Sequence, residues 1–336
     1  NIDEKKINDT SSSSDQNDST TSEEVIYETK SISGVEEVKL DEKILTKDIK
    51  IVGLYDPAEN GLSINMWKNT DGDQLKNIFK KLKKIDFSTD AKEILNISIL
   101  TNAYYPKKNI TAEEFLNFKS DWLIKNSDLN LIKIYLEKNK IIDKQPKLTK
   151  FFIDQYLSNY EIKKACEIFQ KNSEPINDSY LTKLNIYCLI KEEKNEEAQL
   201  IYDLKKEMGF KDKYFENKID YLLKYNDKVD ESISEKTIFD FHLAHQTNPD
   251  FSFEPNESTK KIIWKYLSSA NLLNSFQQIE TSDLEKISLL EKAVHNKDYS
   301  EKDLFQIYKR FQFNINQLLN AEKSYKSLSN IEARAL

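Results

Sequence analysis

The sequence predicts an all-α protein built from antiparallel helical hairpins. Only 5 of its 336 residues are glycine and 6 are proline, whereas 32% are charged and 38% are hydrophobic. Sheets and barrels need more frequent turn residues than this composition supplies. Apolar residues also recur at helical spacing, and the polar segments between the apolar runs are short. We therefore expect successive helices to pack against each other in pairs.

The first 40 residues are expected to be a disordered, acidic tether. From Thr10 to Ser22, nine of thirteen residues are Ser or Thr, and the others are Asp, Gln or Asn. Such a segment buries too little apolar surface to offset the entropy of ordering it. Residues 1–50 carry a formal charge of -6 out of the total of -7. A tract of this kind fits a linker after a removed signal peptide, and it fits a cytosolic tail equally well.

Residues 41–70 are expected to form an extended segment and a loop packed on the body. The apolar run between Glu37 and Tyr55 is the only plausible strand in the chain. Turn-forming Pro, Asn and Gly residues then introduce a structured loop. The apolar side chains of this loop either plug the first helical hairpin or anchor a partner, and the candidate anchors are Tyr55, Met66 and Trp67.

Residues 71–336 are expected to form the helical domain. The residues from Glu332 onward have the pattern of another helix start, so we expect the domain to continue beyond residue 336. Sequence signals mark several helix starts: Ser88 is an N-cap, Thr111 and Glu114 form a capping box, and Pro146 occupies a first-turn position. Later helices are expected at 212–224, 234–245, 256–270, 283–295 and 301–311. In the helix before Gly209, we expect Ala198, Ile201, Leu204 and Met208 to line the buried face.

The hairpins recur at the spacing of two-helix repeats. Their starts lie 35, 30 and 36 residues apart, at Thr111, Pro146, Ile176 and Asp212. A small residue followed four positions later by an aromatic one also recurs at an interval of 33 residues. The small residue lets two helices approach closely, and the aromatic ring fills the groove toward the next hairpin. The expected repeat-packing residues are Phe152, Tyr156, Ala165, Phe169, Ala198 and Tyr202.

Over Leu148 to Met208 these features resemble tetratricopeptide-type repeats. The resemblance implies a right-handed solenoid of antiparallel hairpins with a long surface that binds another protein. The pattern departs from the family where Ile153 and Ile186 replace small residues. The order of segments also resembles an uncharacterised family of bacterial envelope proteins, in the dipeptides 56–57, 61–62 and 66–67 and in the segment 239–243. That likeness implies a location in the periplasm or cell envelope.

The sequence offers little catalytic chemistry. Cys166 and Cys188 lie within apolar helical patterns, where we expect unpaired, buried thiols. His242 and His245 can share one face of a helix, but a metal site needs three or four convergent ligands. We expect both histidines to continue a partly buried face. Glycine-rich phosphate loops and nucleophile elbows are absent from the sequence, so we expect no metal, cofactor or catalytic residue.

These observations favour a non-enzymatic scaffold or adaptor that binds a protein partner in the bacterial envelope, with a cytoplasmic location as the alternative. Nucleic acid is not expected as a partner, because residues 51–336 carry a formal charge of only -1. No run of about 18 apolar residues predicts a membrane span. Two alternatives stay open: a positioning arm for an enzyme whose catalytic domain lies beyond residue 336, and a self-associating structural component of the envelope that forms homo-oligomers.

Overall fold

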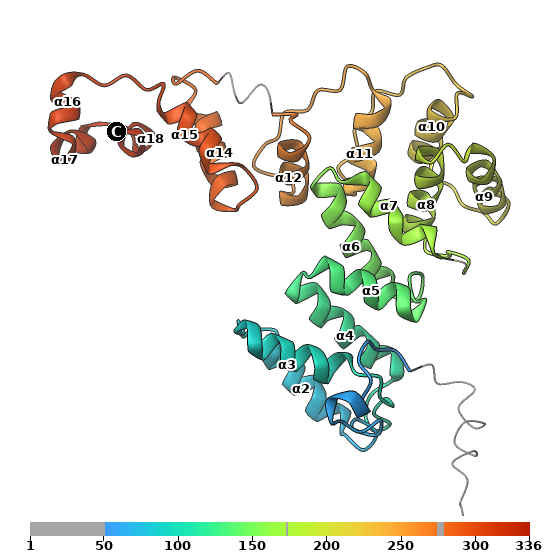
Figure 1. Cartoon of the computed structure of the whole chain (residues 1–336). Helices are drawn as coiled ribbons and strands as arrows, with labels where there is room; N and C mark the ends of the chain where they lie inside the picture. Colours follow the sequence, from blue (N-terminus) through green and yellow to red (C-terminus); the bar gives the residue numbers. More distant parts are fainter. Residues whose placement is uncertain (1–50, 173, 274–278) are drawn as a thin grey trace, which may run out of the picture. The chain divides into compact units, whose positions relative to one another are not determined.

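The computed structural model describes residues 51–172, 174–273 and 279–336 (Figure 1). Within these ranges the chain forms sixteen α-helices, two short 3-10 helices and no strand. The all-helical class is therefore confirmed. None of the helices in the described ranges is both long and apolar enough to cross a lipid bilayer. The expected tether at 1–40 and the first part of the expected extended segment lie outside the described residues.

Many neighbouring helices are joined by short connections, whereas residues 101–111, 223–237 and 248–260 form longer ones. The first half of the described chain contains the 3-10 helix η1 (Ala58–Asn60), then α2 (Gly72–Leu82), α3 (Thr89–Leu100), α4 (Ala112–Asn126), α5 (Leu129–Asn139), α6 (Pro146–Ser158), α7 (Ile162–Gln170), α8 (Ser179–Lys191) and α9 (Asn195–Glu207). The second half contains α10 (Lys213–Leu222), α11 (Ile238–Thr247), α12 (Lys261–Ser269), α14 (Leu284–His295), α15 (Glu301–Tyr308), α16 (Ile315–Leu319), α17 (Ala321–Ser324), η2 (Tyr325–Ser327) and α18 (Asn330–Ala335).

Capping residues explain where many of these helices begin. The Ser88 hydroxyl accepts a hydrogen bond from the N–H of Ala91, and Thr111 forms a reciprocal capping box with Glu114. Pro146 occupies the first position of α6, as the sequence predicts. The predicted helices at 234–245 and 256–270 begin later than expected, at Ile238 and Lys261.

Hairpins α6–α7 and α8–α9 share their geometry at an offset of 33 residues. Helix α6 shifted by 33 positions gives the bounds of α8, and α7 shifted by the same amount begins where α9 begins. The turns match as well, because Tyr160 and Glu193 both adopt the left-handed conformation, with φ of 59° and 62°. After each, a backbone N–H bonds back to the preceding helix, from Glu161 to Tyr156 and from Lys194 to Leu189. Further stacking into a right-handed solenoid stays a prediction.

Helix α6 packs against more neighbours than a simple stack of hairpins provides. It contacts α4, α5, α7 and α8, which are close in sequence, and also α11 and α12, which are not. In an ideal solenoid each repeat contacts only the adjacent repeats. The contacts from α11 and α12 therefore bury α6 from an additional side, and Leu148, Phe152, Ile153 and Leu157 are fully buried.

The predicted repeat-packing residues lie mostly in this interior. Phe152, Ala165, Phe169, Ala198 and Tyr202 are buried, and Tyr156 packs on the core edge with its ring 5.0 Å from that of Phe152. The predicted buried face of α9 is correct in part: Ala198 is buried and Ile201 is half-buried against the core. Leu204 and Met208 are exposed instead, and Tyr202 completes the inner face beside Ala198.

The described part of the predicted strand is not a strand. Residues 51–55 run alongside the end of α3, where the Leu54 N–H donates to the Leu100 carbonyl at 2.6 Å. Tyr55 and Thr101 form one isolated parallel bridge. This single bridge does not continue into a ladder, because the chain enters the 3-10 helix η1 at Ala58. The segment therefore acts as a strap over the helices.

Buried polar side chains hold this strap. The ammonium of Lys119 is inaccessible to solvent and donates to the carbonyls of Val52, at 2.6 Å, and Thr101, at 3.2 Å. The Asn139 side chain accepts from the Gly53 N–H and donates to the Gly53 carbonyl. Burial lowers the pKa of Lys119 to about 7.

The candidate anchor residues lie beside the same region. Trp67 packs on the core with its ring 5.8 Å from that of Phe115, and Tyr55 also contacts the core. Met66 is partly exposed. This packing favours the plug interpretation over the anchor interpretation for Tyr55 and Trp67.

Candidate functional site: a groove beside the disulfide

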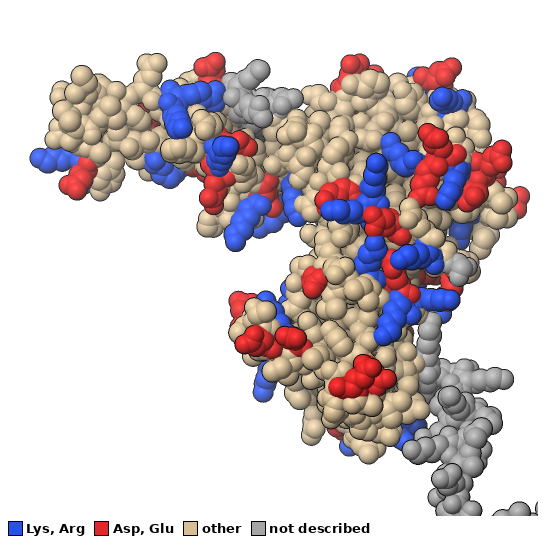
Figure 2. Space-filling model, viewed as in Figure 1, with Lys and Arg blue, Asp and Glu red and all other residues tan. Residues whose placement is uncertain are grey.

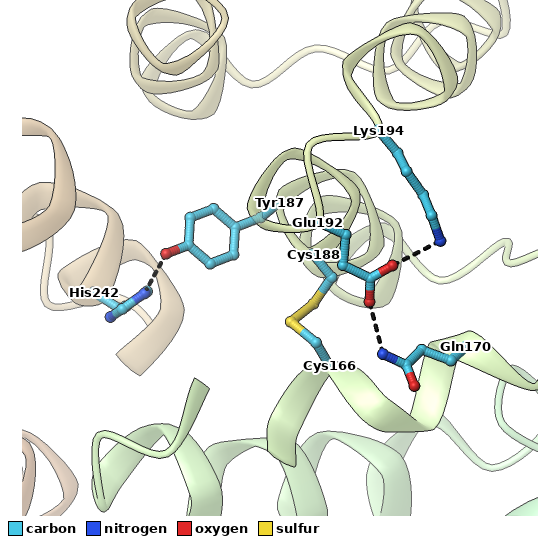
Figure 3. Close-up of a disulfide and its surroundings, with 7 residues drawn as sticks. All are labelled: Cys166, Gln170, Tyr187, Cys188, Glu192, Lys194 and His242. Atoms are coloured by element: carbon cyan, nitrogen blue, oxygen red, sulfur yellow. Dashed lines mark hydrogen bonds and ion pairs between the residues drawn. A yellow bond between two sulfur atoms is a disulfide. The ribbon is translucent and has the colours of Figure 1, made fainter. Parts of the chain in front are cut away.

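A disulfide between Cys166 and Cys188 joins α7 to α8 (Figure 3). The expectation of unpaired thiols is therefore wrong. Each cysteine is buried among apolar residues, as a small hydrophobic side chain would be, but the two Cα atoms are only 5.5 Å apart. The pairing depends on how one hairpin stacks on the next, and a separation of 22 residues in the sequence gives no direct sign of it.

The residue before Cys188 attaches α8 to a different neighbour. Tyr187 points toward α11, where its hydroxyl lies 2.7 Å from Nε2 of His242 (Figure 3). Nearer the start of α8, the buried ammonium of Lys183 pairs with Asp212 at 3.0 Å and with Asp240 at 3.1 Å. Helix α8 is thus attached to α7 by a covalent bond and to α11 by polar contacts in the interior.

The two histidines belong to a continuous chain of hydrogen bonds. Nδ1 of His242 lies 2.8 Å from the Tyr266 hydroxyl, which lies 2.7 Å from Nδ1 of His245. If Tyr187 donates to His242, then His242 donates from Nδ1 to Tyr266, and Tyr266 donates to His245. The opposite direction leaves the Tyr187 proton without an acceptor among the described residues. The first arrangement gives both hydroxyls an acceptor and both nitrogens of His242 a partner.

Burial favours the neutral form of both imidazoles. It lowers the pKa of the fully buried His242 well below its usual value, and the nearby His245 and Lys191 lower it further. Burial also lowers the pKa of His245. The expectation of a buried face is correct for His242. Within the described residues, no three His, Cys, Asp or Glu side chains are grouped closely enough to hold a metal ion.

A groove with a volume of about 930 Å³ lies on the other side of this network. Tyr160 separates the two, since its ring packs 5.7 Å from the rings of both His245 and Tyr266 and its hydroxyl accepts from Gln246. The groove is lined by residues of α5, α7, the end of α8 and α11: Lys133, Glu137, Tyr160, Glu161, Ile162, Lys163, Lys164, Cys166, Glu167, Gln170, Lys171, Cys188, Lys191, Glu192 and Gln246.

Charged side chains of both signs surround the groove. Figure 2 shows basic and acidic side chains intermingled over the surface of α5 and α7 to α9. Five lysines and four glutamates line the groove, and most are already paired. Lys133 pairs with Glu167, and Lys171 pairs with Glu137. Hydrogen bonds from Lys194 and Gln170 lower the pKa of Glu192, whose contacts are drawn in Figure 3.

Two lysines of the groove lack a carboxylate partner within the described part of the chain. Lys191 instead donates to the Gln246 side chain at 3.1 Å and lies over the Tyr187 ring. Burial lowers the pKa of Lys191, because no nearby carboxylate offsets the loss of solvent. Lys163 has no ion pair among the described residues. These two cations are available to an acidic group from outside the chain.

The predicted site residues contribute only in part to this groove. The predicted packing residues Ala165 and Phe169 position α7, but neither lines the groove, and the candidate anchors Tyr55, Met66 and Trp67 lie elsewhere. The charged residues of the groove have no sequence motif. Their only sequence signal is the alternation of Lys and Glu on the outer face of α7, which is also typical of any solvated helix.

Comparisons with known proteins identify no relative. No family model matches the chain, and no curated protein or solved structure is significantly similar to it.

Proposed function

We propose that this chain is a non-enzymatic helical scaffold that binds a segment of a protein partner in the groove beside the disulfide. The observation that carries the proposal is the groove itself, in which the disulfide and a few apolar side chains lie among lysines and glutamates. An apolar floor supplies affinity, and a polar rim supplies orientation and specificity.

The charge balance favours a protein segment over a polyanion. A nucleic acid requires a surface with a marked excess of positive charge. Here five lysines face four glutamates, so the groove has little net charge. A peptide segment with both acidic and basic side chains can form ion pairs with the lysines and glutamates of the groove, in place of the pairs that these residues form with one another. The unpaired Lys163 and Lys191 then favour an acidic residue at one end of the segment.

The disulfide supports a location in the periplasm or cell envelope. Disulfides persist in oxidising compartments and are rare in a reducing cytosol. The bond links two helices that border the groove, so oxidation would fix the relative position of its walls. This argument favours the envelope over the cytoplasmic alternative.

Site-specific photo-cross-linking in the native cell tests the proposal. A photoreactive amino acid at Lys163 samples the groove, and the same residue at the exposed Lys92 on α3 is the control. We expect a discrete cross-linked protein from position 163 and none from position 92.

Charge reversal then tests specificity. Lys191→Glu should abolish the cross-link from position 163, whereas Lys92→Glu should leave it unchanged. Equal cross-linking from both positions, or insensitivity to Lys191→Glu, would contradict a partner in this groove.

A further inference from the structure

The disulfide between Cys166 and Cys188 borders the groove. Both cysteines belong to the groove lining, and 6% of Cys166 and 2% of Cys188 are exposed. Thiol–disulfide exchange begins when a thiolate attacks one sulfur of the bond, so access to one sulfur is sufficient. Cys166 is the more exposed of the two residues, which makes its sulfur the more accessible point of attack.

Each half of the disulfide has an unpaired lysine one helical turn away. Lys163 precedes Cys166 by three residues on α7, and Lys191 follows Cys188 by three residues on α8. Side chains at this spacing lie on the same face of a helix. All four residues line the same groove. Because neither lysine has a carboxylate partner among the described residues, each cation can stabilise an anion that forms beside it.

The glutamates of the groove do not cancel these two cations, because each glutamate is already paired with another lysine. The four pairs are Glu137 with Lys171, Glu161 with Lys164, Glu167 with Lys133, and Glu192 with Lys194, of which the last is drawn in Figure 3. The charge left over beside the disulfide is therefore positive. A neighbouring cation lowers the pKa of a cysteine thiol and makes its thiolate a better leaving group.

We propose that this disulfide is a thiol–disulfide exchange site that accepts electrons from a dithiol in the groove. A thiolate of the dithiol attacks the Cys166 sulfur, the bond between the cysteines breaks, and Cys188 leaves as a thiolate stabilised by Lys191. The second thiolate of the dithiol then attacks its own sulfur in the mixed disulfide, and Cys166 leaves as a thiolate beside Lys163. The dithiol loses two electrons and two protons and becomes a disulfide. Both electrons reside on the cysteine sulfurs, and the protons pass to the cysteines or to solvent.

Reduction of the folded full chain by dithiothreitol tests the proposal. This probe needs access through the groove but no bound protein segment, so the result does not depend on the proposed function. Alkylation followed by mass spectrometry measures the rate of reduction. The rate should be proportional to the dithiothreitol concentration and unchanged by urea well below the unfolding midpoint. A rate that rises with urea in this range would show that the bond is reached only after unfolding, which would overturn the proposal.

Neutralising Lys191 tests whether a cation stabilises the departing thiolate. Lys191→Gln should lower the second-order rate constant roughly threefold, because Cys188 then leaves without a positive charge beside it. Lys191→Arg keeps the charge and should retain the original rate constant. Lys92→Gln, at an exposed position of α3 outside the groove, removes the same charge and should have no effect. Equal rate constants for Lys191→Gln and the unmodified protein, with folding verified by circular dichroism, would overturn the proposed exchange site.

Discussion

Helices α7 and α9 carry the same small-x-x-x-aromatic pair 33 residues apart, but they differ on the side that faces away from their own hairpin. Ala165 of α7 and Ala198 of α9 are both buried against the preceding helix. Helix α7 is covered further by α8 and is linked to it through Cys166. On the outer face of α9, by contrast, Leu200, Leu204 and Met208 are exposed. The repeated pair thus determines the inner face of each hairpin, whereas the outer face depends on what packs next.

The largest expected effect comes from removing the covalent bond that distinguishes α7. Cys166→Ser/Cys188→Ser should lower the free energy of unfolding by roughly 3 kcal/mol, because the bond closes a loop of 22 residues that the unfolded chain otherwise explores freely. Urea denaturation of oxidised protein and variant measures the difference. Equal stability of the two proteins would show that the bond does not constrain the unfolded chain.

Close helix contact at the two alanines should be nearly as important. Ala165→Leu and Ala198→Leu should each cost about 1 to 3 kcal/mol, since both side chains are almost inaccessible and added methyl groups have no room. Thermal melts of both variants measure the cost. No loss at either position would contradict the common packing role of α7 and α9.

Acid should weaken the attachment of α8 to α11. Because burial lowers the pKa of His242 in the folded protein, the unfolded chain takes up the proton first as the pH falls below about 6.5. Stability is therefore lost in this range, by at most about 1.4 kcal/mol per pH unit for one proton. Urea unfolding should show a smaller loss between about pH 7.5 and about pH 5.5 in His242→Gln than in the unmodified protein.

Protonation of Asp154 has the opposite effect on stability as the pH falls. Asp154 is present in both the unmodified protein and His242→Gln. Burial raises its pKa to about 6, so the folded protein takes up this proton first between about 6 and 3.8 and gains stability there. The difference between the two proteins cancels this contribution. Identical acid dependence in the unmodified protein and His242→Gln would contradict a buried, neutral His242.

The equivalent left-handed turn residues should respond differently to glycine. Glu193→Gly should stabilise the protein by up to about 1 kcal/mol, because glycine adopts φ near 62° without strain and Glu193 is exposed. Tyr160→Gly should destabilise it, since the Tyr160 ring packs on His245 and Tyr266. Chemical denaturation of both variants measures these shifts, and a gain in stability at Tyr160 would contradict its packing role.

The smallest expected effect is at the exposed apolar residues of α9, which are Leu200, Leu204 and Met208. Leu204→Ser should change the stability of the protein by less than about 0.5 kcal/mol, because half of the Leu204 side chain is exposed. Urea denaturation of the variant and the unmodified protein provides the measurement. A loss comparable to that of Ala198→Leu would mean that Leu204 belongs to the core.

Local signals made the helices predictable, whereas tertiary contacts determine the site. The Thr111–Glu114 capping box and Pro146 specify helix starts through bonds within a few residues. The 33-residue interval likewise appears in both the sequence and the turns. By contrast, nothing local distinguishes a buried thiol from half of a disulfide. Nor could helical spacing show which apolar face of α9 a neighbour would cover.

The proposed binding groove and the proposed periplasmic or envelope location both depend on the disulfide between α7 and α8. Alkylation of the native protein under denaturing, non-reducing conditions, followed by peptide mass spectrometry, determines its state. We predict that the peptides containing Cys166 and Cys188 are linked to each other and unmodified. Complete alkylation of both thiols would contradict the account.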